Sequence, residues 1–438
     1  MGTGLKVAVI GGGSSYTPEL IEGFIRHYAS FPVTDIVLVD IPEGRRKLEI
    51  VGGLAQRMIE RSRLPIRITL TLDRKEGLKN AHYVSTQMRV GLLEARGWDE
   101  TIPLKYGMLG QETTGAGGMM KALRTIPVLL DICKDMEVLC PDAWLLNFTN
   151  PAGMVTEAIM KHSGIRSIGL CNSPIAAYKW LSGLYEVPAQ RIYCEFAGLN
   201  HLHWISRIEV DGESRLEELL AAGGSYSAGN VPQLAWSDTL IRAMGAIPSY
   251  YLKYYYLHRE MLEEQQAAAV RGETRAETVQ RLEEELFEIY EQPGLAEKPK
   301  QLEQRGGAYY SEAAVNLMKA IHTDSGEIQT LNVMNGETLD FLPADASIEV
   351  NCVVTKNGAV PVPVERVPAA AVGLIQAVKA YESLAIEAAV TGSREKALLA
   401  LSVHPLIDSV GAAEAMLDEM LERNRSYLPR FFQEQEVR

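Results

Sequence analysis

A cysteine that follows a predicted strand is the first residue whose position suggests chemistry. Cys171 comes after the short apolar run Ser-Ile-Gly-Leu and precedes Asn172, Ser173 and Pro174. Because Ser173 can cap a helix and Pro174 suits a first helical turn, we expect a helix to begin directly after Cys171. The carboxyl end of such a strand is where α/β enzymes place their reacting groups. Cys171 is therefore a candidate site residue.

The sequence GLNHLHW places His201 thirty residues after Cys171, in a loop-like segment between two predicted strands. One thiolate and one imidazole are too few for a structural zinc site, which takes four ligands. They are enough for an open metal site whose other positions belong to substrate and water. The alternative is a buried, unreactive cysteine and a hydrogen-bonded histidine, which spacing alone favours. Spacing also does not distinguish His201 from His203.

A glycine turn near the start of the chain is a second candidate site. Residues 11–16, GGGSSY, follow a predicted strand and open a predicted helix. Their backbone N–H groups suit a pyrophosphate, and Asp40 ends the next strand, where a ribose-binding carboxylate belongs. Tyr16 replaces the third glycine of the dinucleotide fingerprint, and the alternative is a tight turn without a ligand. The acid favours NAD over NADP, a preference that Arg45 and Arg46 weaken. The predicted cofactor-binding residues are Gly11, Gly13, Ser14, Ser15 and Asp40.

Strand and helix patterns alternate over about the first 170 residues, with further strand candidates at 66–72 and 82–88 and in AWLLNFTNP and RSIGLCNSP. This alternation predicts an α/β protein with an N-terminal, doubly wound, Rossmann-type parallel sheet in an NAD-binding domain at 1–170. Beyond it, β-rich segments flank a short loop at Asn200. The remaining patterns are helical at 253–268, 274–292 and 308–321 and β-rich at 325–363. We therefore expect a C-terminal α+β domain at 171–438 for catalysis, substrate binding and oligomerisation.

Composition excludes several classes of partner. The 438 residues carry a formal net charge of −13, which argues against nucleic acid or an acidic membrane surface as the main partner. Five cysteines without a CxxC pair suit a reducing cytosol, so we expect a cytoplasmic protein. We expect neither a signal peptide nor an apolar segment of membrane-spanning length.

Other polar residues have both a structural and a functional interpretation. Asn150 precedes a proline at a predicted strand end, where it could bind substrate hydroxyls or terminate a turn. The loop 110–118, GQETTGAGG, is either a second anion cradle or a flexible connection. Without a function, Glu112 in this loop would be an ordinary exposed acid. Arg275 opposes the dipole of a helix that begins with a capping-box pattern, which is easier to explain if it faces an anion. For Arg96, as for Arg275, the alternative is solvation at the surface.

Together these motifs resemble glycoside hydrolase family 4, the NAD-dependent glycosidases, and most closely its 6-phospho-β-glucosidases. The resemblance runs essentially end to end, and the set of motifs is specific although each alone is weak. The motifs are VIGGGSSYTPEL, VDIPEG, IPLKYGMLGQETTGAGG, NFTNPAGMVTEA, GLCNSP, FAGLNH, KPKQLEQRGGAYYS and IEVNCVV. The family implies an overall fold like that of lactate and malate dehydrogenases.

The resemblance implies hydrolysis by oxidation and elimination instead of two-carboxylate chemistry. NAD⁺ takes hydride from carbon 3 of the sugar, a base removes the proton from carbon 2, and the glycosidic oxygen leaves carbon 1. Water then adds, and NADH returns the hydride. A divalent cation, expected to be Mn²⁺, would stabilise the negative charge on the oxygens of carbons 2 and 3. A hard ion on a soft thiolate predicts weak, exchangeable metal binding.

The resemblance also implies residue roles. Cys171 and His201 look like the metal ligands, and Glu112 looks like a residue that assists the metal and the base. The base looks like Tyr251 in IPSYYLKYYY, where only family spacing distinguishes it from Tyr250 and where aromatic packing is the alternative. The implied substrate-binding residues are Arg96, Asn150, Asn172 and Arg275, with Asn172 also among the catalytic residues.

Position 172 is where the sequence departs from part of the family. Members that act on α-linked phosphoglucosides have an aspartate there, which looks like their general acid, whereas the Asn172 amide cannot donate a proton as an acid. The pattern resembles the β-acting members. We therefore predict a cytoplasmic 6-phospho-β-glucosidase, a homodimer or homotetramer, acting on a phosphorylated disaccharide such as cellobiose 6-phosphate or on an aryl β-glucoside. The alternatives are an NAD-dependent 2-hydroxy-acid dehydrogenase, which would release NADH, and a non-catalytic NAD or sugar-phosphate sensor.

Overall fold

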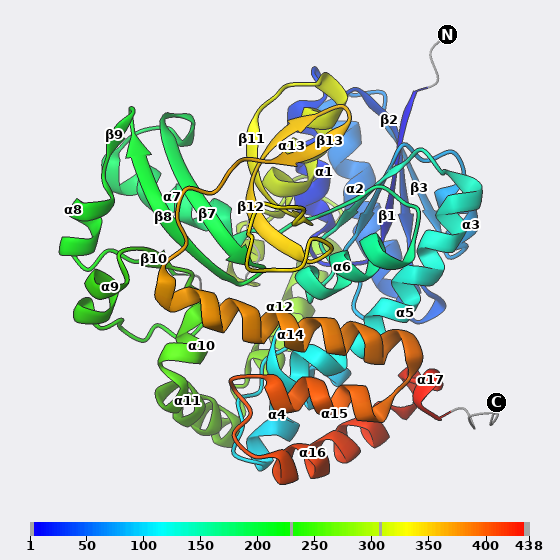
Figure 1. Ribbon diagram of the computed structural model, residues 1–438. Coiled ribbons are helices and arrows are strands. Elements are labelled where there is room, and N and C mark those ends of the chain that lie inside the picture. The colour runs from blue at the N-terminus through cyan, green and yellow to red at the C-terminus, as the bar shows by residue number, and fades with distance from the viewer. Residues whose placement is uncertain (1–3, 228–230, 306–308, 433–438) are drawn as a thin grey trace.

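The strand order of the large sheet is that of a Rossmann fold. The computed structural model describes residues 4–227, 231–305 and 309–432 (Figure 1). Parallel strands lie in the order β3-β2-β1-β4-β5-β6. Their bounds are β1 (Leu5–Ile10), β2 (Val33–Val39), β3 (Arg67–Thr71), β4 (Tyr83–Thr86), β5 (Trp144–Asn147) and β6 (Ser167–Gly169). This order confirms the predicted doubly wound sheet.

Antiparallel strands from the second half of the chain extend the same sheet. β11 (Ile328–Met334) pairs with β6, and β12 (Ser347–Thr355) and β13 (Gly358–Pro361) follow it. The predicted domain boundary at residue 170 stays a prediction. Backbone hydrogen bonds of the sheet nevertheless join strands from the two sides of this boundary. Pairing between strands so far apart in the chain leaves no local pattern in the sequence.

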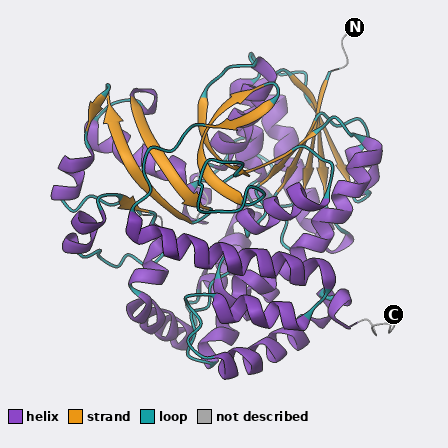
Figure 2. Ribbon diagram, in the orientation of Figure 1, coloured by secondary structure: helices purple, strands orange, loops and turns teal. Residues whose placement is uncertain are grey.

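Helices cover the large sheet on both faces (Figure 2). Strand β1 is buried from Val7 to Ile10, which fits its continuous apolar run, because a parallel sheet covered on both faces has no polar side. The covering helices form two packed groups, each held by contacts between its members. One group is α1 (Thr17–His27), α2 (Arg45–Ser62) and α13 (Tyr310–Thr323), and the other is α3 (Arg74–Leu78), α5 (Gly115–Leu139) and α6 (Ala152–His162).

A smaller antiparallel sheet lies beside the first and packs against β12 through β7. Its strands are β7 (Ile192–Leu199), β8 (Leu202–Val210), β9 (Glu213–Ser214) and β10 (Ile247–Pro248). Only Asn200 and His201 lie between β7 and β8, as expected for the short loop at Asn200. The flanking helices are α7 (Ser173–Tyr185), α8 (Leu216–Ala221) and α9 (Asp238–Met244).

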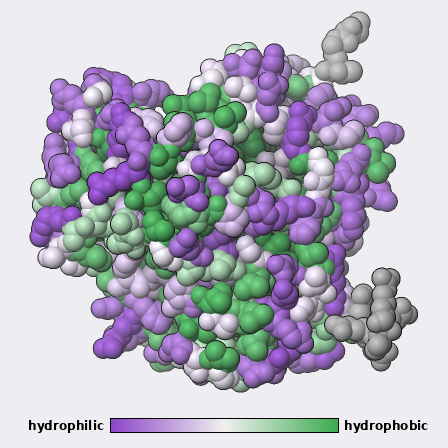
Figure 3. Space-filling model, viewed as in Figure 1, coloured by the Kyte–Doolittle hydropathy of each residue, from purple (hydrophilic) through white to green (hydrophobic). Residues whose placement is uncertain are grey.

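The remaining helices form a layer below both sheets in Figure 1. They are α4 (Leu92–Lys105), α10 (Lys253–Tyr256), α11 (His258–Arg271), α12 (Arg275–Tyr290), α14 (Ala369–Thr391), α15 (Arg394–Val403), α16 (Val410–Arg423) and α17 (Pro429–Phe432). Among the described residues, α14 alone is long and apolar enough to cross a membrane, but it packs against α5, α6 and α15 as a core helix does. Figure 3 shows a mixed polar and apolar surface with an apolar area near α15, where Leu399 and Val403 are exposed.

Three local expectations need correction. Ser173 does not cap α7: it is the first helical residue, and Asn172 is the N-cap. Helix α5 begins at Gly115, inside the segment 110–118 that we expected to be a loop, so its first turn runs through the glycine-rich sequence. The helical pattern at 253–268 is divided at Leu257 into α10 and α11. The capping box at the start of α12 is present as expected.

Candidate active site

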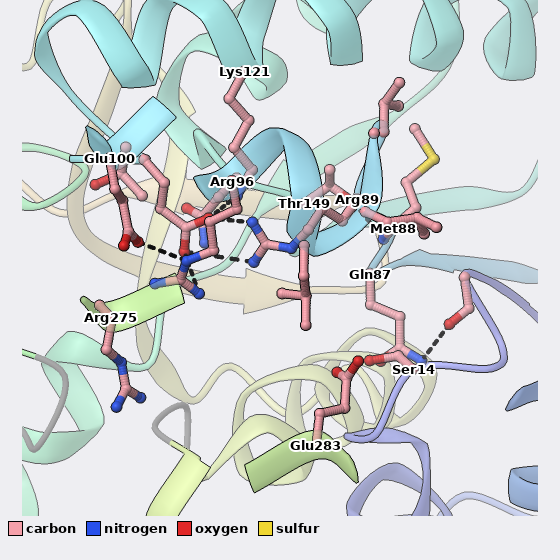
Figure 4. Close-up of a pocket in the computed structure, with 18 of the residues that line it drawn as sticks. Ser14, Gln87, Met88, Arg89, Arg96, Glu100, Lys121, Thr149, Arg275 and Glu283 are labelled. Carbon is pink, nitrogen blue, oxygen red and sulfur yellow. Dashed lines mark hydrogen bonds and ion pairs between the residues drawn. The ribbon is translucent and has the colours of Figure 1, made fainter. Parts of the chain in front are cut away.

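One large cavity, of about 1030 Å³, lies at the carboxyl ends of the parallel strands. It is lined by residues that lie within three positions of the ends of five of these strands: Gly11, Asp40, Gln87, Asn150 and Cys171. Residues from α4, α5 and α12 close it from the other side, and Figure 4 shows Arg96, Lys121 and Arg275 there. A crevice at strand ends is the usual ligand site of an open α/β sheet, and this volume suits a cofactor together with a substrate.

The glycine turn and Asp40 form one end of the cavity. The Gly13 N–H donates a 2.7 Å hydrogen bond to Asp40 Oδ2. A Cβ at Gly13 would lie 2.8 Å from the same oxygen, so only glycine allows the carboxylate to sit on the turn. Ser14 lines the cavity, whereas the Ser15 hydroxyl is buried and donates to Glu283 Oε1 at 3.2 Å; binding of the cofactor by either residue stays a prediction.

Cys171, Asn172 and His201 line the cavity together. The Cys171 Sγ accepts a 3.4 Å hydrogen bond from the Ser173 N–H, and burial, followed by the Glu349 charge, raises the pKa of the thiol well above its ordinary value. His203 is fully buried, with its nitrogens bonded to Glu349 (2.5 Å) and Tyr226 (3.0 Å). The structure therefore distinguishes the two histidines that spacing could not.

His201 is held in an unusual backbone position. Its φ of 63° is left-handed, a region that non-glycine residues occupy at some energetic cost and often at functional sites. Its ring stacks on Tyr251 with centroids 3.8 Å apart, and Nδ1 lies 3.1 Å from Thr113 Oγ1. Burial lowers the pKa of His201 to about 4, so the ring is neutral at pH 7.

The donor atoms at this point fit an open metal site. No group of three or more His, Cys, Asp or Glu side chains arranged for a metal occurs within residues 4–227, 231–305 and 309–432. A neutral imidazole and a thiol in one cavity would provide two protein ligands and leave positions for substrate oxygens. The raised pKa means that the Cys171 thiol is protonated near neutral pH. A cation that bound to its sulfur would therefore have to displace this proton.

Tyr251 and Tyr250 differ in what they contact. Both lie in the 3-10 helix η3 (Tyr250–Leu252), but only Tyr251 is among the cavity-lining residues described. Tyr250 packs edge-to-face on Tyr226, and burial raises its pKa well above the ordinary value. The geometry therefore agrees with family spacing in favouring Tyr251.

Two arginines predicted to bind substrate lie close together. Arg96 is buried and donates through Nε to Glu100 Oε1 at 2.7 Å, while Glu100 Oε2 accepts the Ala276 N–H at 2.7 Å. This carboxylate thus ties Arg96 to the first turn of α12, where Arg275 lies. Arg275 donates to the Arg305 carbonyl oxygen, and no carboxylate pairs with it among the described residues. Burial and the Arg96 charge lower the pKa of Arg275.

Glu112 is the centre of a buried charge cluster and not an exposed acid. It pairs with Arg89, with Arg96 Nη1 at 3.2 Å and with Lys121 Nζ at 2.8 Å. Burial alone would raise the pKa of Glu112, but these cations hold it well below its ordinary value. Burial and the Arg89 charge lower the pKa of Lys121 to about 7.

Several cavity residues were not found from the sequence. Gln87 and Arg89 lie within three residues of the end of β4, so the rule that ligands bind at strand ends could have found them. Lys121 lies inside α5, and Arg305 ends the 3-10 helix η4 (Lys300–Arg305), with its guanidinium over the Tyr16 ring. The sequence around Lys121 and Arg305 has no motif that would identify either as a cavity residue. Asn150 lines the cavity as predicted, and its Oδ1 accepts the Ala152 N–H at 3.2 Å.

Comparison with known proteins agrees with this geometry. The chain is 50% identical to the probable 6-phospho-beta-glucosidase of Bacillus subtilis (strain 168), over 99% of both chains. The structure of the 6-phospho-beta glucosidase from Thermotoga maritima with manganese, NAD+ and glucose-6-phosphate matches with a TM-score of 0.89 and 33% identity, over 97% of this chain and 99% of that one.

A lactate dehydrogenase from Cryptosporidium parvum shares the fold alone, with a TM-score of 0.53 and 14% identity over 88% of this chain and 99% of that one. This confirms the expected dehydrogenase-like architecture. The family descriptions match at residues 6–186, "Family 4 glycosyl hydrolase", and 196–407, "Family 4 glycosyl hydrolase C-terminal domain". The chain therefore belongs to family 4 of the glycosyl hydrolases.

Proposed function

We propose that this protein is a 6-phospho-β-glucosidase that hydrolyses phosphorylated β-glucosides, such as cellobiose 6-phosphate or an aryl β-glucoside 6-phosphate. The observation that carries the proposal is that one cavity is lined by the glycine turn, by Cys171 and His201, by Tyr251 and by Arg275. A dinucleotide site, two metal ligands, a base and an anion site are the parts that hydrolysis by oxidation and elimination needs. The Bacillus and Thermotoga relatives carry names of the same activity.

The glycine turn and Asp40 suit NAD, and Cys171 with His201 suits a divalent cation such as Mn²⁺. When bound, NAD supplies reversible hydride transfer at carbon 3, and the cation supplies positive charge beside the oxygens on carbons 2 and 3. The Gly13 and Ile41 N–H groups hold the Asp40 carboxylate in place, where it would accept a hydrogen bond from a ribose hydroxyl of the cofactor. The two protein ligands leave room for the substrate diol.

Tyr251 removes the proton from carbon 2. Its ring stacks on His201, one of the two residues assigned to the metal, and both residues line the cavity. A phenol ionises more readily when positive charge lies nearby, which leaves more of the phenolate base at neutral pH, and the cavity supplies cations from Arg89, Arg96 and Lys121. Glu112 binds these three cations and keeps them in position.

Arg275 and Arg96 bind the 6-phosphate. Arg275 forms no ion pair with a described carboxylate, and Arg96 is aligned with it through Glu100. Anchoring the phosphate fixes the position of the sugar ring, which converts binding energy into orientation of carbons 2 and 3. Asn150 and Asn172 offer amide groups to the sugar hydroxyls from the strand ends.

The anomeric preference follows from position 172. The Asn172 side chain lines the cavity at the start of α7, where its amide can donate a hydrogen bond but cannot act as an acid. The carboxylic acid that α-acting relatives would have at this position is therefore missing. We accordingly propose the β-glucoside as substrate.

We further propose a cytoplasmic homodimer or homotetramer. The cysteines are all free and buried, which supports a reducing compartment. Leu399, Val403 and Val410 are exposed apolar residues on α15 and α16 and support contact with a second copy of the chain.

The test is hydrolysis of p-nitrophenyl β-glucoside 6-phosphate by the purified protein, stripped of cofactor and metal and then supplied with NAD⁺, Mn²⁺, both or neither. We expect cleavage only with both, no net NADH, and no cleavage of the α anomer. Cleavage that is indifferent to NAD⁺ would refute the mechanism. Net NADH without cleavage would favour a dehydrogenase.

A further inference from the structure

The loop before α5 contacts the histidine that we assign to the metal, and its hydrogen bonds have directions that can be worked out. Gln111 Oε1 accepts the Thr113 N–H, and it also accepts the Thr114 N–H at 3.2 Å. Backbone N–H groups can only donate, so the atom facing them is the amide oxygen and not the amide nitrogen. This orientation therefore follows from the backbone itself.

The orientation of Gln111 determines the role of the Thr113 hydroxyl. Thr113 Oγ1 lies 2.7 Å from the same Gln111 oxygen, which cannot donate, so the single hydroxyl proton of Thr113 lies between them. Towards His201, Thr113 Oγ1 has only lone pairs left. The 3.1 Å contact with His201 Nδ1 is therefore a hydrogen bond from Nδ1–H to Thr113 Oγ1.

A neutral imidazole with its proton on Nδ1 has its lone pair on Nε2. We infer that Gln111 and Thr113 are positioning residues that hold His201 as the Nδ1–H tautomer, so that Nε2 is the metal ligand. The inference rests on the proposed metal site. His203 provides a contrast, because Glu349 and Tyr226 occupy both of its nitrogens and leave no lone pair for a metal.

The glycine-rich sequence of this loop fits the same role. A Cβ at Gly118, in the first turns of α5, would lie 2.5 Å from the carbonyl carbon of Thr113. Glycine at this position lets the helix approach Thr113 closely and fixes its backbone. The segment GQETTGAGG therefore supports a metal ligand. This role differs from the two that the sequence suggested, an anion cradle and a flexible connection.

The experiment measures Mn²⁺ binding, from the electron paramagnetic resonance signal of free Mn²⁺, with NAD⁺ present and substrate absent. Thr113→Val removes the acceptor at nearly constant volume, and we expect the Kd for Mn²⁺ to rise about 10- to 100-fold. Thr113→Ser keeps the hydroxyl and should stay within about threefold of the wild type. Thr114→Val is the matched control, because the Thr114 hydroxyl contacts Tyr255 and His404 instead.

A second variant tests the chain of hydrogen bonds. Gln111→Leu frees the Thr113 proton to point at His201 Nδ1, so this variant should also weaken Mn²⁺ binding. The double variant Thr113→Val/Gln111→Leu should bind Mn²⁺ no more weakly than Thr113→Val alone. NAD⁺ affinity serves as the check on folding and should not change. An additive double variant would contradict the inference.

The tautomer can be observed directly by ¹⁵N NMR of the histidines in the metal-free protein, with His201 assigned from a His201→Asn variant. We expect the proton on Nδ1. A proton on Nε2, or an unchanged Kd in Thr113→Val, would overturn the inference while leaving the proposed function intact. A wild-type protein that bound no Mn²⁺ would overturn the proposed metal site and, with it, the role assigned to Thr113.

Discussion

Replacing Arg275 by methionine should remove the preference for a phosphorylated sugar. Arg275 lies in the first turn of α12, where it opposes the helix dipole, and its only hydrogen bond in the described residues is to the Arg305 carbonyl. Its Nε is buried without a partner there. Within the described residues, no carboxylate forms an ion pair with the guanidinium, so its charge is available to a phosphate.

The expected magnitude follows from these contacts. A guanidinium that binds phosphate through two charge-assisted hydrogen bonds contributes about 1.5 kcal/mol for each, or about 3 kcal/mol in total. At 1.36 kcal/mol for each factor of ten, Arg275→Met should lower kcat/KM about 150-fold for a phosphorylated substrate. Methionine keeps most of the apolar volume, so packing around α12 should change little.

The assay compares kcat/KM for p-nitrophenyl β-glucoside with and without the 6-phosphate. Arg275→Met should lower only the value for the phosphorylated substrate. Arg281→Met is the matched control on the same helix, since Arg281 is exposed and contacts only the Gly272 carbonyl among the contacts described for it. If Arg275→Met lowered both values equally, or if Arg281→Met had the same effect, the assignment of Arg275 to the phosphate would be refuted.

Three further predictions concern the metal, the base and the charge cluster behind the glycine turn. Cys171→Ser should weaken Mn²⁺ binding at least tenfold and leave NAD⁺ binding unchanged, both measured by titration calorimetry; equal loss of both would contradict the ligand role. Tyr251→Phe should lower kcat about 10²- to 10⁴-fold, with Tyr250→Phe as the control, and similar rates for the two variants would refute the choice of base. Arg305 and Lys47 outweigh burial and hold the pKa of Glu283 at about 2, below the ordinary value of 4.5. This stabilisation of roughly 3 kcal/mol is present above pH 4.5 and is lost as the pH falls towards 2. The difference in unfolding free energy between wild type and Glu283→Gln, measured by urea unfolding, should therefore shrink over that pH range. A difference that stayed constant would contradict the prediction.

Much of the nucleotide-binding half can be predicted from the sequence because its signals are local. Most of the parallel strands contain short apolar runs, and residues that follow four of them, Gly11, Asp40, Asn150 and Cys171, lie at one edge of the sheet. The Rossmann order then places them together. No knowledge of distant contacts is needed for this part of the site.

The rest of the site depends on contacts between distant residues, which leave no local pattern. Spacing could not separate His201 from His203, because the difference lies in their partners, Thr113 for one and Glu349 for the other. Lys121 looks like an ordinary surface lysine on a helix, yet it is buried against Glu112. Ser15 fits the phosphate-binding pattern but turns towards Glu283, which comes 268 residues later.

The central claim is that cleavage proceeds through loss of the proton on carbon 2, with Tyr251 as the base. The most direct measurement is hydrolysis of the phosphorylated β-glucoside in D₂O with NAD⁺ and Mn²⁺, followed by NMR of the sugar product. We predict deuterium at carbon 2 of the glucose 6-phosphate released. Full turnover with the original hydrogen retained at carbon 2 would contradict the account.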